Sequence, residues 1–274
     1  MTTRGVRVST EWLAVREPAD AAARARDLVE RLRTQRPATG RWVIHDLGCG
    51  TGAVGRWLAP LLPGPQRWVL HDRDADLLEI AACALPGPAA DGAAVTVEVR
   101  QSDITRLEPG GLAGATLITA SALLDMLTES ELARVISAGV GAGCPILLTL
   151  SVIGRVELTP AEPLDRRVAA AFNADQRRAT ERGRLLGPEA VTWTVEQLGR
   201  LDVEVLVRPS PWRLGAGQRD LLVQWLTGWA GAAREQDPEL AAEAGAYMRR
   251  RQAQATAGEL RATVHHADLL VSPR

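Results

Sequence analysis

The segment from Trp42 to Gly52 limits the fold more than any other part of the sequence. It reads Trp-Val-Ile-His-Asp-Leu-Gly-Cys-Gly-Thr-Gly, an apolar run that leads directly into a loop with three glycines. Glycine lets the backbone adopt positive φ and approach a ligand closely. Free N–H groups at the start of a following helix attract electron-rich groups. The segment therefore predicts a buried strand, a ligand-binding loop and a helix in succession.

The same order of strand and helix repeats along the first 150 residues. We expect strands at 42–44, 68–70, 95–99, 116–120 and 146–150, and helices at 19–32, 54–62, 76–85 and 129–141. Short apolar strands that alternate with helices form a mostly parallel sheet covered on both faces. Beyond residue 152 we expect helices at 164–181, 190–201, 218–233 and 238–257, and strands at 203–207 and 260–264.

Polar residues follow the predicted strands at the positions where each strand ends. Asp46 ends the first strand, Asp72 follows the second, Asp103 follows the third and Ser121 ends the fourth. Rossmann-like sheets bind ligands at this edge. With these residues, Asp-Leu-Gly-Cys-Gly-Thr-Gly resembles the first motif of class I S-adenosylmethionine (SAM)-dependent methyltransferases. The resemblance extends over roughly residues 41 to 151.

This resemblance implies a fold and a set of cofactor contacts. The fold would be α/β, with a Rossmann-like, seven-stranded, mostly parallel sheet, helices on both faces, an N-terminal helix and C-terminal helical insertions. By the family pattern Asp46 and the loop backbone would hold the methionine part of SAM, Asp72 the ribose and Asp103 with Ile104 the adenine, while Ser121 would lie near the sulfonium. The expected cofactor-binding residues are Asp46, Gly48, Cys49, Gly50, Gly52, Asp72, Arg73, Asp103, Ile104 and Ser121.

The resemblance also suggests how the chain is organised. Residues 1–40 would form a helical cap, 41–156 the SAM-binding core, and 157–274 the rest of the sheet with helical insertions over the substrate. No linker is long or polar enough to indicate a second independent domain, so we expect one globular domain in all.

The same glycines admit a second interpretation. Gly50-Thr-Gly-Ala-Val-Gly55 spells GxGxxG, the dinucleotide-binding fingerprint, and the carboxylate of Asp72 follows it. That interpretation leaves Asp103 and Ser121 without roles, so we favour SAM as the cofactor, with S-adenosylhomocysteine as its product.

The methyl acceptor is less determined by the sequence. The net charge is −1 and there is no basic stripe, which disfavours nucleic acid. Ser121-Ala-Leu-Leu stands where adenine and cytosine N-methyltransferases carry a Pro-Pro-aromatic motif. We therefore expect a small-molecule acceptor with an O-, N- or C-nucleophile, as in the specialised metabolism of a bacterium. A non-catalytic SAM-binding or regulatory protein and an RNA methyltransferase remain alternatives.

Several residues are candidates for the acceptor site. Asp125 is the candidate general base, although it equally suits an acid before the helix at 129–141. The candidate substrate-binding residues are Trp12, Arg16, Asn173, Gln176 and Arg177, the last three of which also suit a solvated helix face. Trp225 and Trp229, four residues apart, are expected to pack in the core or at the surface of a homodimer. For His265 and His266 we favour exposure over a place in the acceptor pocket.

The cysteines and the apolar runs bear on the cellular compartment. Cys49, Cys83 and Cys144 lack the spacing of a metal site or disulfide framework, so we expect no metal and a reducing, cytoplasmic location. The N-terminus lacks the apolar run of a signal peptide, and no apolar stretch approaches the ~18 residues needed to cross a bilayer.

Overall fold

The computed structural model describes residues 8–35, 37–84, 87–108 and 110–274. Three expectations fall partly outside these ranges. The expected N-terminal cap at 1–40 includes residues 1–7 and 36, and the expected helix at 76–85 ends on Leu85. The expected core at 41–156 includes residues 85, 86 and 109.

One large sheet organises the chain. Its strands run in the order β3-β2-β1-β4-β5-β10-β8, and the short β9 pairs with β10. The bounds are β1 Trp42–Leu47, β2 Gln66–Asp72, β3 Val95–Gln101, β4 Leu117–Ser121, β5 Ile146–Thr159, β8 Val203–Pro209, β9 Trp212–Leu214 and β10 Arg261–Pro273. The sheet therefore has eight strands and not seven, because the sequence pattern did not indicate the three-residue β9.

The first five strands are parallel, and the last strand of the chain runs in the opposite direction. Strand β1 pairs in parallel with both β2 and β4, and β10 runs antiparallel between β5 and β8. All five parallel strands consequently end at the same edge of the sheet. The loops after β1, β2, β3 and β4 lie together there, which is where ligands bind in sheets of this kind.

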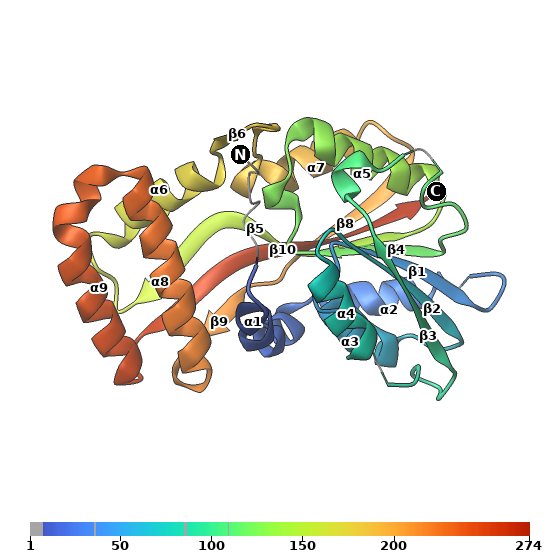
Figure 1. The fold of residues 1–274 in the computed structure, drawn as a ribbon, viewed down its shortest axis with the longest axis horizontal. Coiled ribbons are helices and arrows are strands. Elements are labelled where there is room, and N and C mark those ends of the chain that lie inside the picture. Colours follow the sequence, from blue (N-terminus) through green and yellow to red (C-terminus); the bar gives the residue numbers. More distant parts are fainter. Residues whose placement is uncertain (1–7, 36, 85–86, 109) are drawn as a thin grey trace.

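Helices cover both faces of the sheet (Figure 1). Their bounds are α1 Thr10–Ala23, α2 Arg26–Arg33, α3 Ala53–Leu58, α4 Ala75–Cys83, α5 Glu129–Gly141, α6 Asp165–Gln176, α7 Ala190–Leu198, α8 Arg219–Gln236 and α9 Ala241–Thr256. Helices α5 and α7 lie on one face and α2, α3 and α4 on the other. Alternate residues of β5 point to opposite faces of the sheet: Ile146 and Leu148 pack in the core on one face, and Leu147 packs in the core on the other.

The helix expected at 19–32 is in fact two helices. The apolar spacing in this stretch is helical throughout, yet α1 ends at Ala23 and α2 begins at Arg26. Arg24 adopts an extended ψ of 136°, and the N–H of Ala25 donates to Asp268 at 2.8 Å. A tertiary hydrogen bond to β10 therefore replaces helix continuation, which local periodicity cannot reveal.

Strands β5 and β10 are much longer than the sequence indicated. We expected five residues in each, but the structure has 14 in β5 and 13 in β10. Their extended ends leave the main sheet and carry a lobe of α6, α8 and α9, at the left in Figure 1. The expected boundary after residue 156 falls inside β5. The helix expected at 164–181 ends at Gln176 and gives way to the hairpin β6 Ala179–Thr180 and β7 Gly183–Arg184.

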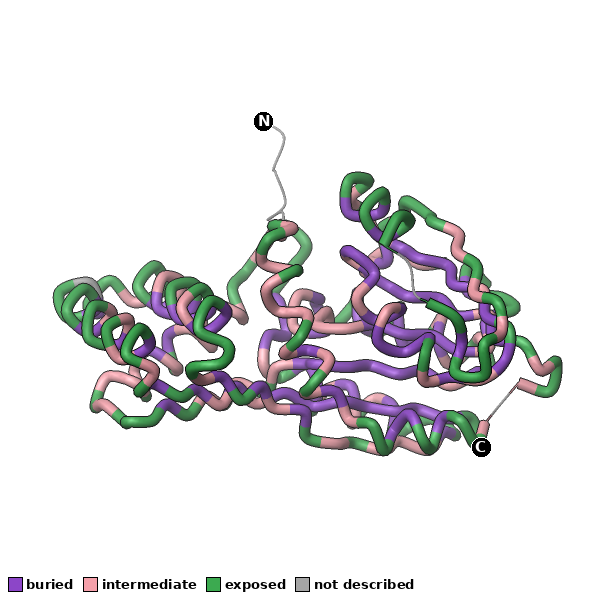
Figure 2. Tube along the Cα trace, turned by 90° about the horizontal axis from the view of Figure 1, so that it is seen from below, coloured by how far each residue is buried: buried purple, intermediate pink, exposed green. Residues whose placement is uncertain are grey.

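Buried residues follow the strands from the main sheet into the lobe (Figure 2). The lobe has its own apolar core, which includes Trp212, Leu226 and Tyr247. Among the residues that the structure describes, no helix combines the length and apolar character needed to span a membrane.

Candidate functional site

A cavity of about 1100 Å³ opens at the carboxyl ends of the parallel strands and continues toward the lobe. Its glycine-loop half is formed by residues at the ends of β1 to β4 and just after them, chiefly Gly48, Cys49, Gly50, Asp72, Arg73, Asp103, Ile104 and Ser121. Its aromatic half is formed by Trp12, Phe172, Trp212, Trp225, Trp229 and His266, with Asp125, Asn173 and Gln176. One continuous space thus joins a backbone loop to an aromatic chamber.

The glycine loop has the backbone geometry that only glycine adopts readily. Gly48, Gly50 and Gly52 have φ of 65°, 55° and 81°. A Cβ at Gly48 would lie 3.2 Å from the side chain of Leu123, so the residue also allows a close approach. Gly52 is the N-cap of α3 and lies outside the described lining of the cavity. It starts this helix, and its contact with the cofactor stays a prediction.

Asp72 connects the loop to the end of β2. Its carboxylate accepts hydrogen bonds from the N–H of Gly50 at 2.9 Å and from the N–H of Asp74 at 3.0 Å. The carboxylate therefore fixes the loop and borders the cavity at once. Farther along the same edge, Asp103 accepts from Thr105 and begins a short 3-10 helix, Ile104–Arg106.

Asp46 is buried beneath the loop and lies outside the described lining of the cavity. One carboxyl oxygen accepts from the hydroxyl of Thr119 at 2.8 Å, and no described residue donates a hydrogen bond to the other. Burial raises the pKa of Asp46 to about 7. Its contact with the methionine part of SAM stays a prediction.

Helix α1 covers the cavity from one side. Leu13 lies over the loop, with its Cδ1 3.5 Å from where a Cβ of Gly50 would stand, and Glu17 pairs with Arg56 of α3 at 2.6 Å. Arg16 is held by Asp20 at 2.9 Å and lies over the ring of Trp212 at 4.9 Å. The helix is thereby anchored to both halves of the cavity.

Asp125 and α6 border the aromatic half. Gln176 donates to the Asp125 carboxylate at 3.4 Å, and burial raises the pKa of Asp125 to about 6. Asn173 donates to the carbonyl of Gly154 at 2.7 Å, which connects α6 to β5. Arg177 points elsewhere: it pairs with Glu189 at 2.8 Å and is outside the described lining.

Of the aromatic residues that line the cavity, Trp12 was assigned to the acceptor site from the sequence, but Trp212, Trp225 and Trp229 were not. Trp225 and Trp229 pack in the lobe core, as expected, with rings stacked 5.3 Å apart, but they also border the cavity. The expectation of exposure is wrong for His266, which is 3% exposed and lies 5.1 Å from the ring of Trp212. Because β10 continues to Pro273, His266 lies in mid-strand instead of at its end. Burial lowers the pKa of His266 to about 3.

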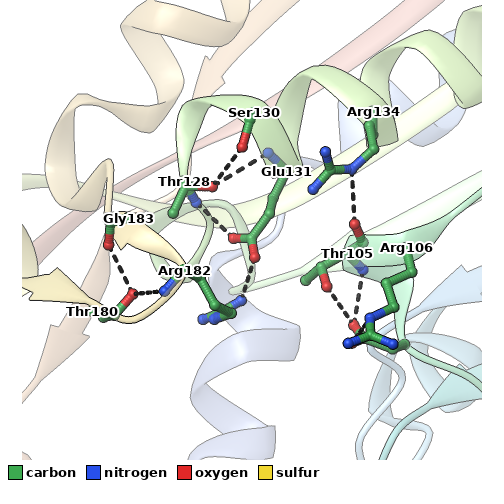
Figure 3. A network of polar contacts seen from close by, with 10 residues as sticks. Thr105, Arg106, Thr128, Ser130, Glu131, Arg134, Thr180, Arg182 and Gly183 are labelled. Atoms are coloured by element: carbon green, nitrogen blue, oxygen red, sulfur yellow. Dashed lines mark hydrogen bonds and ion pairs between the residues drawn. The ribbon is translucent and has the colours of Figure 1, made fainter.

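The hairpin β6–β7 lies beside the start of α5 (Figure 3). Arg182 borders the cavity and donates to the Glu131 carboxylate at 2.7 Å. The other oxygen of Glu131 accepts from the N–H of Thr128, which caps α5. The capping box that starts the helix thus also holds the hairpin.

Sequence reasoning also missed Arg24. It is 3% exposed, borders the cavity and donates to the hydroxyl of Ser121 at 3.2 Å. The sequence around Arg24 has the pattern of one continuous helix, so it does not indicate that this arginine is buried at the cavity.

The sheet order, the loop and the cavity at the strand ends define the fold of class I SAM-dependent methyltransferases. A solved candidate type II methyltransferase from Anaeromyxobacter dehalogenans is similar, with a TM-score of 0.51, 18% identity and coverage of 91% of this chain and 97% of that chain. The cyclopropane synthase MmaA2 from Mycobacterium tuberculosis has a TM-score of 0.49, 13% identity and coverage of 97% and 95%. A SAM-dependent methyltransferase from Thiobacillus denitrificans, solved with S-adenosylhomocysteine, has a TM-score of 0.48, 13% identity and coverage of 98% and 100%. No family profile and no curated protein matches the sequence.

Proposed function

We propose that the protein transfers a methyl group from SAM to a small molecule. The observation that carries this proposal is the continuous cavity of about 1100 Å³, which joins a glycine loop flanked by acids to an aromatic chamber. Such a space has room for a nucleoside donor and an acceptor together, since ligand pockets are typically ~300–1,000 Å³.

The residues of the glycine-loop half fit this donor. Asp72, Asp103 and Ile104 all border the cavity. The Asp72 carboxylate is suited to ribose hydroxyls, and Asp103 with Ile104 would address the adenine. The positive φ of Gly48 and Gly50 opens the loop backbone to the donor's amino-acid part. When bound, SAM supplies an electrophilic methyl group. The protein's contribution is then to position the two reactants and exclude water.

Asp125 is the proposed general base for an acceptor that must lose a proton. Its carboxylate borders the aromatic half, and the amide of Gln176 holds it at 3.4 Å. A base whose pKa is about 6 is mostly ionised at neutral pH and still accepts a proton effectively. The proton of the acceptor's hydroxyl or amine would pass to a carboxylate oxygen of Asp125.

The aromatic half supports a small acceptor rather than a nucleic acid. Aromatic side chains form much of its lining. Arg16 and Arg182, which border the cavity, are already paired with Asp20 and Glu131. The net charge of −1 offers no field for a polyanion. A cytoplasmic location, a homodimer and a role in bacterial specialised metabolism stay predictions.

Calorimetric titration with SAM, S-adenosylhomocysteine and NADH tests the donor. We expect micromolar affinity for the first two and none for NADH; binding of NADH alone would contradict the proposal. A screen of small hydroxyl- and amine-bearing acceptors, read out as formation of S-adenosylhomocysteine, tests catalysis. SAM binding without turnover on any acceptor favours the non-catalytic alternative, and turnover only on RNA favours the RNA methyltransferase.

The Asp125→Asn variant tests the base once an acceptor is known. The amide keeps the shape of the side chain but cannot accept the proton at neutral pH. We expect a fall in turnover of about 100-fold, with unchanged affinity for S-adenosylhomocysteine. In the wild type, turnover should fall as the pH drops below about 6, since Asp125 becomes protonated there.

A further inference from the structure

Arg24 lies where α1 and α2 would otherwise join. Helix α1 ends at Ala23, and the extended backbone at Arg24 turns the chain before α2 begins at Arg26. The hydrogen bond from the N–H of Ala25 to Asp268 holds this turn against β10. The break carries the side chain of Arg24 inward, where it is 3% exposed and borders the cavity.

The guanidinium of Arg24 is only partly satisfied by the protein. One nitrogen, Nη2, donates to the Ser121 hydroxyl at 3.2 Å, and the group lies over the ring of Trp57 at 5.1 Å. Nε and Nη1 are buried, and neither has a hydrogen-bond partner among the described residues. A buried charge without a hydrogen-bonded counter-ion is costly, so such a group points to an absent anionic partner.

Two acids whose charge acts on Arg24 are engaged with other groups. Asp20 accepts hydrogen bonds from Arg16 and from the indole N–H of Trp212, each at 2.9 Å. Asp268 accepts from two backbone N–H groups, at 2.8 and 2.7 Å, and from a serine hydroxyl at 2.5 Å. Hydrogen bonds to these other groups therefore use most of the acceptor capacity of both carboxylates.

A third acid, Asp46, also contributes negative charge near Arg24. It keeps one unpartnered oxygen, but no hydrogen bond joins it to Arg24 among the contacts of the described residues. The described acids therefore supply negative charge around the guanidinium without forming a direct ion pair with it.

The place of Arg24 relative to the glycine loop identifies the end of the donor that would reach it. In the sheet, β1 lies between β2 and β4. Asp72 ends β2 and Ser121, the partner of Arg24, ends β4, so the two residues flank the loop from opposite sides. A donor whose ribose lies at Asp72 and which crosses the loop would bring its other end toward Arg24.

We propose that Arg24 binds the carboxylate at the amino-acid end of SAM. This inference rests on the proposed function, because it assumes the same donor in the glycine-loop half. Arginine suits the task, since its planar guanidinium forms charge-assisted hydrogen bonds with a carboxylate. The break between α1 and α2 then has a functional reason: it brings a cation from the covering helix to the donor.

Calorimetry with two ligands and matched variants tests this inference. The ligands are S-adenosylhomocysteine and 5′-deoxy-5′-(3-aminopropylthio)adenosine, which keeps the adenosine and the amine but lacks the carboxylate. In Arg24→Met we expect affinity for S-adenosylhomocysteine to fall about 10- to 100-fold, the range for a hydrogen bond to a charged group. Affinity for the decarboxylated analogue should change less than about twofold. Arg26→Met, which removes an exposed arginine two residues away, should leave both affinities unchanged.

The outcomes separate this inference from the proposed function. Wild-type protein that binds neither ligand contradicts the proposed function itself. Wild-type binding with equal losses for both ligands in Arg24→Met, or with no loss, overturns the role of Arg24 alone. If Arg24→Met does not fold, Arg24→Lys carries the test, because it keeps the charge but loses the planar group. Its preference for S-adenosylhomocysteine over the analogue should then be smaller than that of the wild type, and an unchanged preference overturns the inference.

Discussion

The two halves of the cavity are built in different ways. In the glycine-loop half, the contacts come from the backbone and from acids at the ends of parallel strands, such as Asp72, the last residue of β2, and Asp103, two residues after β3. In the aromatic half, side chains come from α1, α6, α8, β9 and β10, which are far apart in the chain. One half depends on local backbone geometry and the other on how the lobe packs.

This difference implies that the halves respond separately to substitution. The glycine-loop half is supported by the main sheet and its two cores. In the aromatic half, Trp225 and Trp229 line the cavity and also belong to the lobe core. Changes at the strand ends should therefore alter affinity for the donor with little effect on stability. Changes in the aromatic half should alter stability or turnover and leave that affinity intact.

The largest expected effect is a loss of donor affinity on substitution of Asp72. In Asp72→Ala the donor would lose its ribose contact, and the N–H of Gly50 would lose its acceptor. We expect affinity for S-adenosylhomocysteine to fall about 100-fold, or about 3 kcal/mol, measured by calorimetry. The free energy of unfolding should change by less than about 1 kcal/mol. Unchanged affinity would show that Asp72 does not contact the donor. The Asp72→Asn variant can still accept the hydrogen bond from Gly50, so its affinity should lie between those of the wild type and Asp72→Ala.

The same division explains how far the sequence could be interpreted. The loop from Gly48 to Gly52 and the acids after the strands were predicted because each depends on neighbours in the chain. Arg24 and His266 were not, since a hydrogen bond to β10 interrupts the helix at Arg24 and the length of β10 buries His266. The additional strand β9 and the long β5 follow from contacts with β10, which apolar runs do not reveal.

A substitution at Gly154 tests the support of the aromatic half. Gly154 has φ of 73°, and a Cβ there would lie 2.8 Å from Pro188 and 3.0 Å from the Asn173 amide. We expect Gly154→Ala to lower the free energy of unfolding by about 2 kcal/mol in urea titrations, with donor affinity unchanged. Gly141→Ala is the control, because that Cβ meets nothing within 4 Å and the residue ends α5. A comparable loss of stability in the control would contradict the steric explanation.

The pH dependence of donor affinity tests whether the ionised carboxylate of Asp46 attracts the donor. Burial raises its pKa to about 7, so the carboxyl is mostly protonated at pH 6 and mostly ionised at pH 8. If the ionised form attracts the donor's ammonium group, affinity for S-adenosylhomocysteine should rise about tenfold over this interval, or about 1.4 kcal/mol. Asp46→Asn should show no such rise. A rise that persists in the variant would assign the titration to another group.

The smallest expected effect is at Trp229, which lies in the aromatic half and in the lobe core. The residue is 2% exposed, and its indole N–H has no hydrogen-bond partner in the described part of the chain. Phenylalanine therefore removes volume without leaving a new polar group unpaired. We expect Trp229→Phe to cost about 1 kcal/mol of stability in thermal unfolding, because the stacked contact with Trp225 at 5.3 Å is largely kept. Affinity for S-adenosylhomocysteine should stay within about twofold of the wild type. A tenfold loss of that affinity would show that the two halves are coupled through α8, and the separate roles argued for them would not hold.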